Sequence, residues 1–206
     1  MDGEPKVKRR GGSGFWIALA AVAVVAGSVL YLYNGGAGKG PAAPAAVLAL
    51  QGLVKGEVAA FTLRDAPIAV PPVTFKDAEG KEADLKAWRG KVVLLNIWAT
   101  WCAPCRHEMP ALDALKAELG GKDFDVLALS TDRGGIDKPK KFWTETGIKA
   151  LGLYLDTGDA THSLGILGMP TTLLIDREGR EIGRLVGPAE WSSPEAKALL
   201  LAALKG

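Results

Sequence analysis

Two cysteines, Cys102 and Cys105, are the residues of this chain whose type and spacing most clearly suggest chemistry. They are the only cysteines among the 206 residues. A pair at this spacing can exchange a disulfide with another protein or supply half of a zinc site. Zinc would need ligands from His107 and His162, the only histidines, and His107 is poorly placed to close a shell with both sulfurs. A static disulfide over so short a loop would add little stability, so the pair predicts a redox-active dithiol.

The flanking sequence predicts that the pair lies between a strand and a helix. Residues 92–99 form an apolar run with β-branched side chains and the length of a buried strand. Apolar residues then recur every three or four positions along 103–119, which is the pattern of one helix face. Cys102 would stand at the helix N-terminus, where free N–H groups and the helix dipole favour a thiolate. We therefore expect Cys102 to attack a substrate disulfide and Cys105 to resolve the mixed disulfide.

Glu108 is the candidate acid–base residue. It lies three positions after Cys105, at the border of the helix face that turns toward the core. A carboxyl group held there would be partly desolvated, which raises its pKa and makes it a proton acceptor for Cys105. The alternative is a solvated glutamate on the helix surface, and the sequence does not choose between the two.

The rest of the folded part alternates between strand and helix patterns. After the helix come an apolar strand, a second helix, a short apolar run, a hairpin and a C-terminal Ala/Leu-rich helix. These are expected at 124–130, 138–146, 153–155, 171–175 with 181–186, and 193–204. A short helix at 47–54 and a strand at 73–75 precede them. A βαβ unit followed by a hairpin and a helix predicts an α/β fold with a mixed central sheet and helices on both faces.

The chain divides into four expected segments. Residues 1–14 are basic and would stay in the cytoplasm, and residues 15–33 form an uncharged apolar run of about the length of a bilayer-spanning helix. Residues 34–46 have the Gly/Ala/Pro composition of a flexible linker, and 47–206 form the folded domain. The apolar run exceeds the usual core of a cleaved signal peptide, which is the alternative, so we expect a single-pass anchor. An exported dithiol that reduces other proteins needs a separate electron donor.

The charge distribution argues against nucleic-acid binding. Residues 1–40 hold five Lys or Arg against two Asp or Glu, whereas residues 41–206 hold twenty against twenty-one. The basic excess is therefore confined to the segment around the expected anchor, where it orients a membrane protein. We expect no nucleic-acid partner.

The residues around the cysteines resemble the thioredoxin superfamily. The stretch WATWCAPCRHEMP at 98–110, followed by GMPT at 168–171, is similar to membrane-tethered reductases of the TlpA, ResA and CcmG type. The likeness extends from about residue 56 to the C-terminus and includes the anchor, and GPAEW at 187–191 looks closest to TlpA. The resemblance implies a thioredoxin-like fold behind one transmembrane helix.

The same resemblance implies a role for each residue of the motif. Cys102 would be the nucleophile and Cys105 the resolving thiol. Trp101, Pro104 and Glu108 would support them, with Glu108 as the acid near the pair. The chemistry would use neither a metal nor a cofactor.

The resemblance also implies roles for residues outside the motif. Met169–Pro170 would be a cis bond that faces the dithiol and receives the substrate backbone. Asn96 stands where cytosolic thioredoxins carry a buried aspartate. Because an amide cannot take up a proton, that task would fall to Glu108 or to water.

The resemblance further implies a task in the bacterial cell envelope. Proteins of the TlpA type reduce disulfides in a Sco-type copper chaperone and in the copper-site subunit of cytochrome oxidase, with electrons from a membrane dithiol relay. We therefore expect an inner-membrane reductase that faces the periplasm and serves cytochrome oxidase biogenesis. ResA and CcmG relatives act instead on apocytochrome c or its haem-handling partners, and apocytochrome c is the alternative client. A DsbA-type oxidant, a copper-binding carrier and a binding module with vestigial cysteines are further alternatives.

Overall fold

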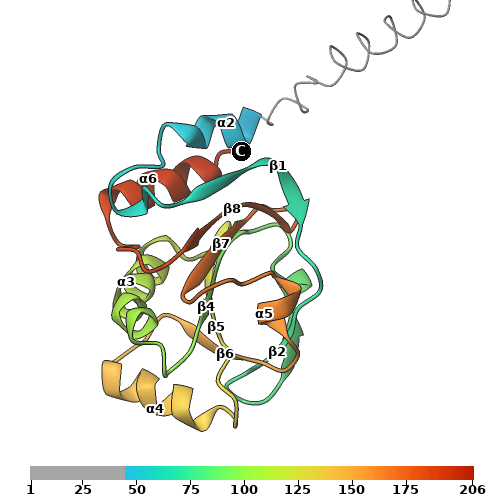
Figure 1. Ribbon diagram of the computed structural model, residues 1–206, viewed down its shortest axis with the longest axis vertical. Coiled ribbons are helices and arrows are strands. Elements are labelled where there is room, and N and C mark those ends of the chain that lie inside the picture. The colour runs from blue at the N-terminus through green and yellow to red at the C-terminus, as the bar shows by residue number, and fades with distance from the viewer. Residues whose placement is uncertain (1–44) are drawn as a thin grey trace, which may run out of the picture. The chain divides into compact units, whose positions relative to one another are not determined.

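The computed structural model describes residues 45–206, whose arrangement is drawn in Figure 1. Among these residues, no helix is both long enough and apolar enough to cross a membrane. The expected anchor at 15–33 and the cytoplasmic segment at 1–14 lie outside the described residues, as does the linker up to residue 44, so these remain predictions. Helix α2 (Ala45–Gln51) opens the described part, just before the expected start of the domain.

An eight-stranded mixed sheet forms the centre of the fold. In chain order its strands are β1 (Thr62–Ala69), β2 (Thr74–Asp77), β3 (Glu82–Asp84), β4 (Val92–Trp98), β5 (Phe124–Ser130), β6 (Gly152–Asp156), β7 (Thr171–Ile175) and β8 (Arg180–Val186). Their order across the sheet is β1-β8-β7-β4-β5-β6-β2-β3. β5 is parallel to both β4 and β6, and every other neighbouring pair is antiparallel.

Helices cover both faces of this sheet (Figure 1). The remaining elements are the helices α3 (Ala103–Leu119), α4 (Asp137–Thr146), α5 (Ala160–Ser163) and α6 (Pro194–Ala203), with 3₁₀ turns η1 (Gly56–Val58) and η2 (Leu85–Trp88). Apolar residues of α2, α3 and α6 share one core, and those of α5 join a second core. The sheet therefore separates two hydrophobic layers.

β4 lies at the centre of the sheet, and all seven of its residues are buried. Because side chains alternate along a strand, Val92, Leu94 and Trp98 enter the core beneath α3. Val93, Leu95 and Ile97 enter the core beneath α5. Asn96 shares the face of Leu94 and Trp98 and is fully buried, although it is polar. This is the one interruption of an otherwise apolar strand.

The expected α/β fold with a mixed sheet is confirmed, including the parallel β4–α3–β5 unit and the β7–β8 hairpin. β1 and β3 were not expected from the sequence. β1 contains Pro67, lacks alternation and pairs with β8 across a register shift, which an edge strand tolerates. β3 has three residues, too few for a pattern to be recognised.

Candidate active site

A disulfide joins Cys102 and Cys105 where β4 leads into α3. Cys102 is the N-cap of α3, and its Sγ accepts a hydrogen bond from the backbone N–H of Cys105 at 3.3 Å. Pro104 lies between them in the exposed first turn. Cys102 is 6% exposed and Cys105 is 0% exposed, so a partner reaches Cys102 first. The N–H donor at the helix end would also stabilise a thiolate on Cys102.

A buried carboxylate holds the loop that precedes Cys102. Asp132, just beyond β5, accepts a hydrogen bond from the Thr100 backbone N–H at 2.8 Å and another from the Thr100 hydroxyl. It also accepts one from the Ser130 hydroxyl at 2.8 Å. The two hydrogen bonds from Thr100 therefore fix the loop to the end of β5. The sequence motifs did not predict the contact between Thr100 and Asp132, because these residues lie 32 positions apart.

A hollow of about 850 Å³ lies beside this loop and is lined by both Trp101 and Met169. Trp101 is 69% exposed, which leaves a large aromatic surface available for contact. The Met169–Pro170 bond is cis, as the resemblance implied. Thr131 links the loop of Met169 to β4. Its hydroxyl lies 3.2 Å from the Trp98 carbonyl oxygen and 3.7 Å from Met169 Sδ. The fold thus brings two expected site residues, Trp101 and Met169, to one hollow.

Glu108 lies one turn after Cys105 on α3 and is 3% exposed. Its Oε1 accepts a hydrogen bond from Asn96 Nδ2 at 2.7 Å. Its Oε2 accepts two more, from the Ala189 backbone N–H and from Trp191 Nε1, each at 3.2 Å. All three donors are neutral, so the carboxyl group is held in the core without a cationic partner. The structure therefore selects the buried alternative for this residue.

Burial raises the pKa of Glu108 from 4.5 to about 7, and the three hydrogen bonds oppose this rise only in part. A carboxyl group with this pKa binds and releases a proton near neutral pH, which is what general acid–base catalysis requires. The site therefore combines a disulfide with a buried carboxyl group one turn further along α3.

Two contacts of this buried network were not predicted from the sequence. Asn96 Nδ2 also donates to Thr172 Oγ1 at 2.9 Å, and these two residues are opposite one another on β4 and β7. Trp191 reaches Glu108 across 83 positions of sequence. Only the folded sheet brings these groups together beneath α3.

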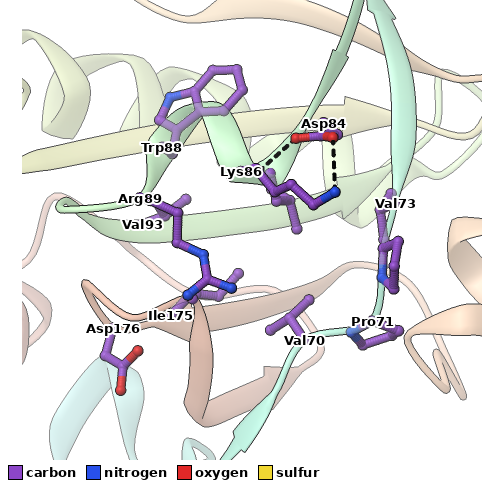
Figure 2. Close-up of a pocket in the computed structure, with 13 residues that line it drawn as sticks. Val70, Pro71, Val73, Asp84, Lys86, Trp88, Arg89, Val93, Ile175 and Asp176 are labelled. Carbon is purple, nitrogen blue, oxygen red and sulfur yellow. Dashed lines mark hydrogen bonds and ion pairs between the residues drawn. The ribbon is translucent and has the colours of Figure 1, made fainter.

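A second cavity lies at the other end of β4 (Figure 2). It measures about 150 Å³, and its lining combines apolar groups such as Val93 and Ile175 with the charged side chains of Lys86 and Arg89. Val93 is near the start of β4 and Cys102 follows its end, so roughly 20 Å of strand separates the cavity from the disulfide. The described lining contains no cysteine. Because this cavity lies at the opposite end of β4 from the disulfide, we place the functional site at the disulfide.

The fold and the site together define a thioredoxin-like thiol:disulfide oxidoreductase. The evidence is a mixed sheet, a Cys-x-x-Cys disulfide at a strand-to-helix junction, a cis-proline loop that lines the adjoining hollow, and a buried carboxyl group one turn beyond.

Comparison with known proteins identifies the family. The Redoxin family model matches residues 66–200, so the chain belongs to the Redoxin family. The thiol-disulfide oxidoreductase ResA of Bacillus thuringiensis subsp. konkukian is 34% identical over 117 residues, which are 57% of this chain and 67% of ResA. The thiol:disulfide interchange protein HelX of Rhodobacter capsulatus is 34% identical over 113 residues, which are 54% of this chain and 60% of HelX.

Solved structures agree with this assignment. A putative thiol:disulfide interchange protein DsbE from Chlorobium tepidum superposes with a TM-score of 0.60 at 30% identity, over 67% of this chain and 96% of its own. A putative thiol-disulfide oxidoreductase from Bacteroides vulgatus gives a TM-score of 0.56 at 31% identity, over 66% of this chain and 94% of its own. The chain is therefore an enzyme, a thiol-disulfide oxidoreductase, and its family implies protein disulfides as substrates.

Proposed function

We propose that this protein reduces protein disulfides at the periplasmic face of the bacterial inner membrane. The observation that supports this most is the difference between the two sulfurs. Cys102 caps α3 with some exposure, whereas Cys105 is fully enclosed one turn above the buried carboxyl group of Glu108. This asymmetry suits a pair in which one thiol meets the client and the other completes the exchange.

The proposed cycle begins with both cysteines reduced. The Cys102 thiolate attacks a client disulfide, forms a mixed disulfide and releases one client thiolate, which takes up a proton. Cys105 then loses its proton to Glu108 and attacks Cys102 Sγ, which breaks the mixed disulfide and releases the second client thiolate. This thiolate also takes up a proton. The client gains two electrons and two protons, and the enzyme ends in the disulfide form described above. A membrane dithiol relay returns the two electrons.

Trp101, Pro104, Met169 and Pro170 complete the proposed site. Trp101 and Met169 line the hollow next to the disulfide, so they would contact the client chain. Pro170 is buried and follows Met169 through the cis bond, and its loop would receive the client backbone. Pro104 would shape the first turn of α3 between the two sulfurs.

The proposed clients are copper-handling proteins of cytochrome c oxidase assembly, namely a Sco-type chaperone and the copper-site subunit. Support comes from the likeness of the segment at 187–191 to TlpA, noted in the sequence. Apocytochrome c is the second candidate, because the chain is 34% identical to a relative named ResA, one of the types for which the resemblance implies this client.

A trapping experiment decides between these clients. The Cys105→Ala variant cannot resolve its mixed disulfide, so clients should remain attached to Cys102 and be identified by mass spectrometry after non-reducing purification. Recovery of oxidase copper proteins is expected, and recovery of c-type cytochromes instead would select the second candidate. The matched control is the Cys102→Ser, Cys105→Ala double variant, which should capture nothing. Equal capture by that control would show that the recovered proteins are not disulfide-linked clients.

The proposed location depends on the apolar run at 15–33 and the basic residues before it. A membrane-impermeant maleimide added to intact cells should label Cys102 of the reduced Cys105→Ala variant. A cytoplasmic thiol protein in the same cells serves as the control and should stay unlabelled. Labelling of Cys102 only after lysis would contradict the periplasmic orientation.

A further inference from the structure

The carboxyl group of Glu108 accepts hydrogen bonds from a segment that lies far from the cysteines in the sequence. Both hydrogen bonds to its Oε2 come from residues 187–191, the segment between β8 and α6, through the Ala189 N–H and the Trp191 indole. Trp191 is 0% exposed, so its ring is enclosed in the core beside α3. A buried indole needs an acceptor for its N–H, and Glu108 supplies it.

The same segment is attached to the cis-proline loop. The Gly187 N–H donates to the Pro170 carbonyl at 2.8 Å, at the start of the segment. Gly187 adopts a φ of 112°, a conformation that favours glycine. Just past the other end of the segment, Ser193 caps α6 by accepting from the Ala196 N–H. The segment is therefore fixed on both sides of its contacts with Glu108.

We propose that Trp191, together with the Ala189 N–H, is a positioning residue for Glu108. It would hold Oε2 in one place and favour the ionised carboxylate, so that Glu108 can accept the proton of Cys105. This inference rests on the proposed function of Glu108 and adds the residues that position its carboxyl group. The physical reason is that hydrogen-bond donors aimed at a desolvated carboxylate stabilise its charged form.

The other groups that surround the Glu108 carboxyl are also uncharged. β4 contributes Asn96, which itself contacts Thr172 of β7, and both are uncharged. Glu190, within the segment, is exposed and accepts from Ser192 instead. Among the described residues, none of the groups that shift the pKa of Glu108 is charged. On α3 itself the neighbouring Arg106 and His107 are exposed, and the enclosed titratable group next to Glu108 is the thiol of reduced Cys105.

The first test compares pH profiles of client reduction by the full-length chain. Trp191→Phe keeps an aromatic ring but removes the N–H donor. The pH midpoint of the reduction rate that is assigned to Glu108 should therefore rise by about one pH unit. Near pH 6.5 the rate should fall roughly tenfold, and it should recover above pH 9, where Glu108 is ionised regardless. A rate lowered equally at every pH would overturn the proposal. Trp88→Phe is the matched control, because Trp88 donates to Asp125 away from the dithiol, and its midpoint should not move.

A double-mutant cycle separates this inference from the proposed function. If Trp191 acts through Glu108, then Trp191→Phe should change neither rate nor profile in a Glu108→Gln background. An undiminished effect there would overturn the positioning role. If Glu108→Gln alone leaves the wild-type profile intact, the proton-acceptor role itself fails. If Glu108→Gln abolishes the midpoint while Trp191→Phe leaves it in place, only the inference fails.

A measurement on the wild-type chain covers the case in which Trp191→Phe does not fold. The ¹⁵N-resolved indole resonance of Trp191 should shift with pH at the same midpoint as the Glu108 carboxyl carbon. The shift should vanish in Glu108→Gln. An indole resonance that stays constant while Glu108 titrates would refute the contact and the proposal.

Discussion

Replacing Cys102 with serine should lower the rate of client disulfide reduction by about a thousandfold or more. A serine hydroxyl remains protonated at neutral pH and cannot form a disulfide, so neither the attack nor the later exchange occurs. The fall can be measured with insulin as a generic disulfide substrate and with the clients recovered by trapping. Ala103→Ser is the matched control, because it places the same side chain at the neighbouring exposed position.

The companion variant Cys105→Ala distinguishes the two thiols. It should still form a mixed disulfide in a single turnover, because Cys102, the more accessible thiol, is intact, but it should not release reduced client. A fast first step in Cys102→Ser and none in Cys105→Ala would reverse the assigned roles. An unchanged cellular phenotype in Cys102→Ser would favour a binding module, and copper affinity that persists in Cys105→Ser would favour a carrier that does not use dithiol chemistry.

Replacing Glu108 with glutamine should produce the second largest loss, about a hundredfold in the rate of mixed-disulfide resolution at pH 7. Glutamine keeps the shape of the side chain but cannot take the proton of Cys105. Asn96 Oδ1, which has no partner among the described residues, could turn to accept from the new amide, so the fold should be retained. In single-turnover kinetics from pH 5 to 9, the resolution rate of the wild type should change with pH around a midpoint. This midpoint should be absent in the variant.

The same substitution should also change how stability depends on pH. The pKa of Glu108 is about 7 in the fold and 4.5 ordinarily, so between these values the folded chain keeps a proton that the unfolded chain has lost. The free energy of unfolding should therefore decrease by about 3 kcal/mol as the pH rises from about 4.5 through 7. This decrease should be missing in Glu108→Gln.

Urea unfolding of the disulfide form at several pH values measures this difference. The matched control is Glu118→Gln on the same helix, because Glu118 is exposed and should leave the pH dependence as in the wild type. Parallel stability curves for the wild type and Glu108→Gln would contradict the raised pKa of the buried carboxyl group.

The sequence alone was sufficient for the elements that depend on local patterns. The apolar run before the cysteines, the three-and-four spacing after them and the turn between 175 and 181 predicted β4, α3 and the β7–β8 hairpin. These patterns are readable because burial imposes a period on each element. The dithiol was equally evident, since a chain with two cysteines offers one pairing.

What only the tertiary structure decided is the environment of Glu108. Its place at the border of a helix face allowed either burial or exposure, and the outcome depended on what α3 packs against. Asn96 comes from a strand 12 positions earlier in the chain and Trp191 from a segment 83 positions later. A carboxyl group's proton affinity is set by desolvation and by donors within hydrogen-bonding distance. Such groups are assembled by the fold, so no pattern local to Glu108 could specify them.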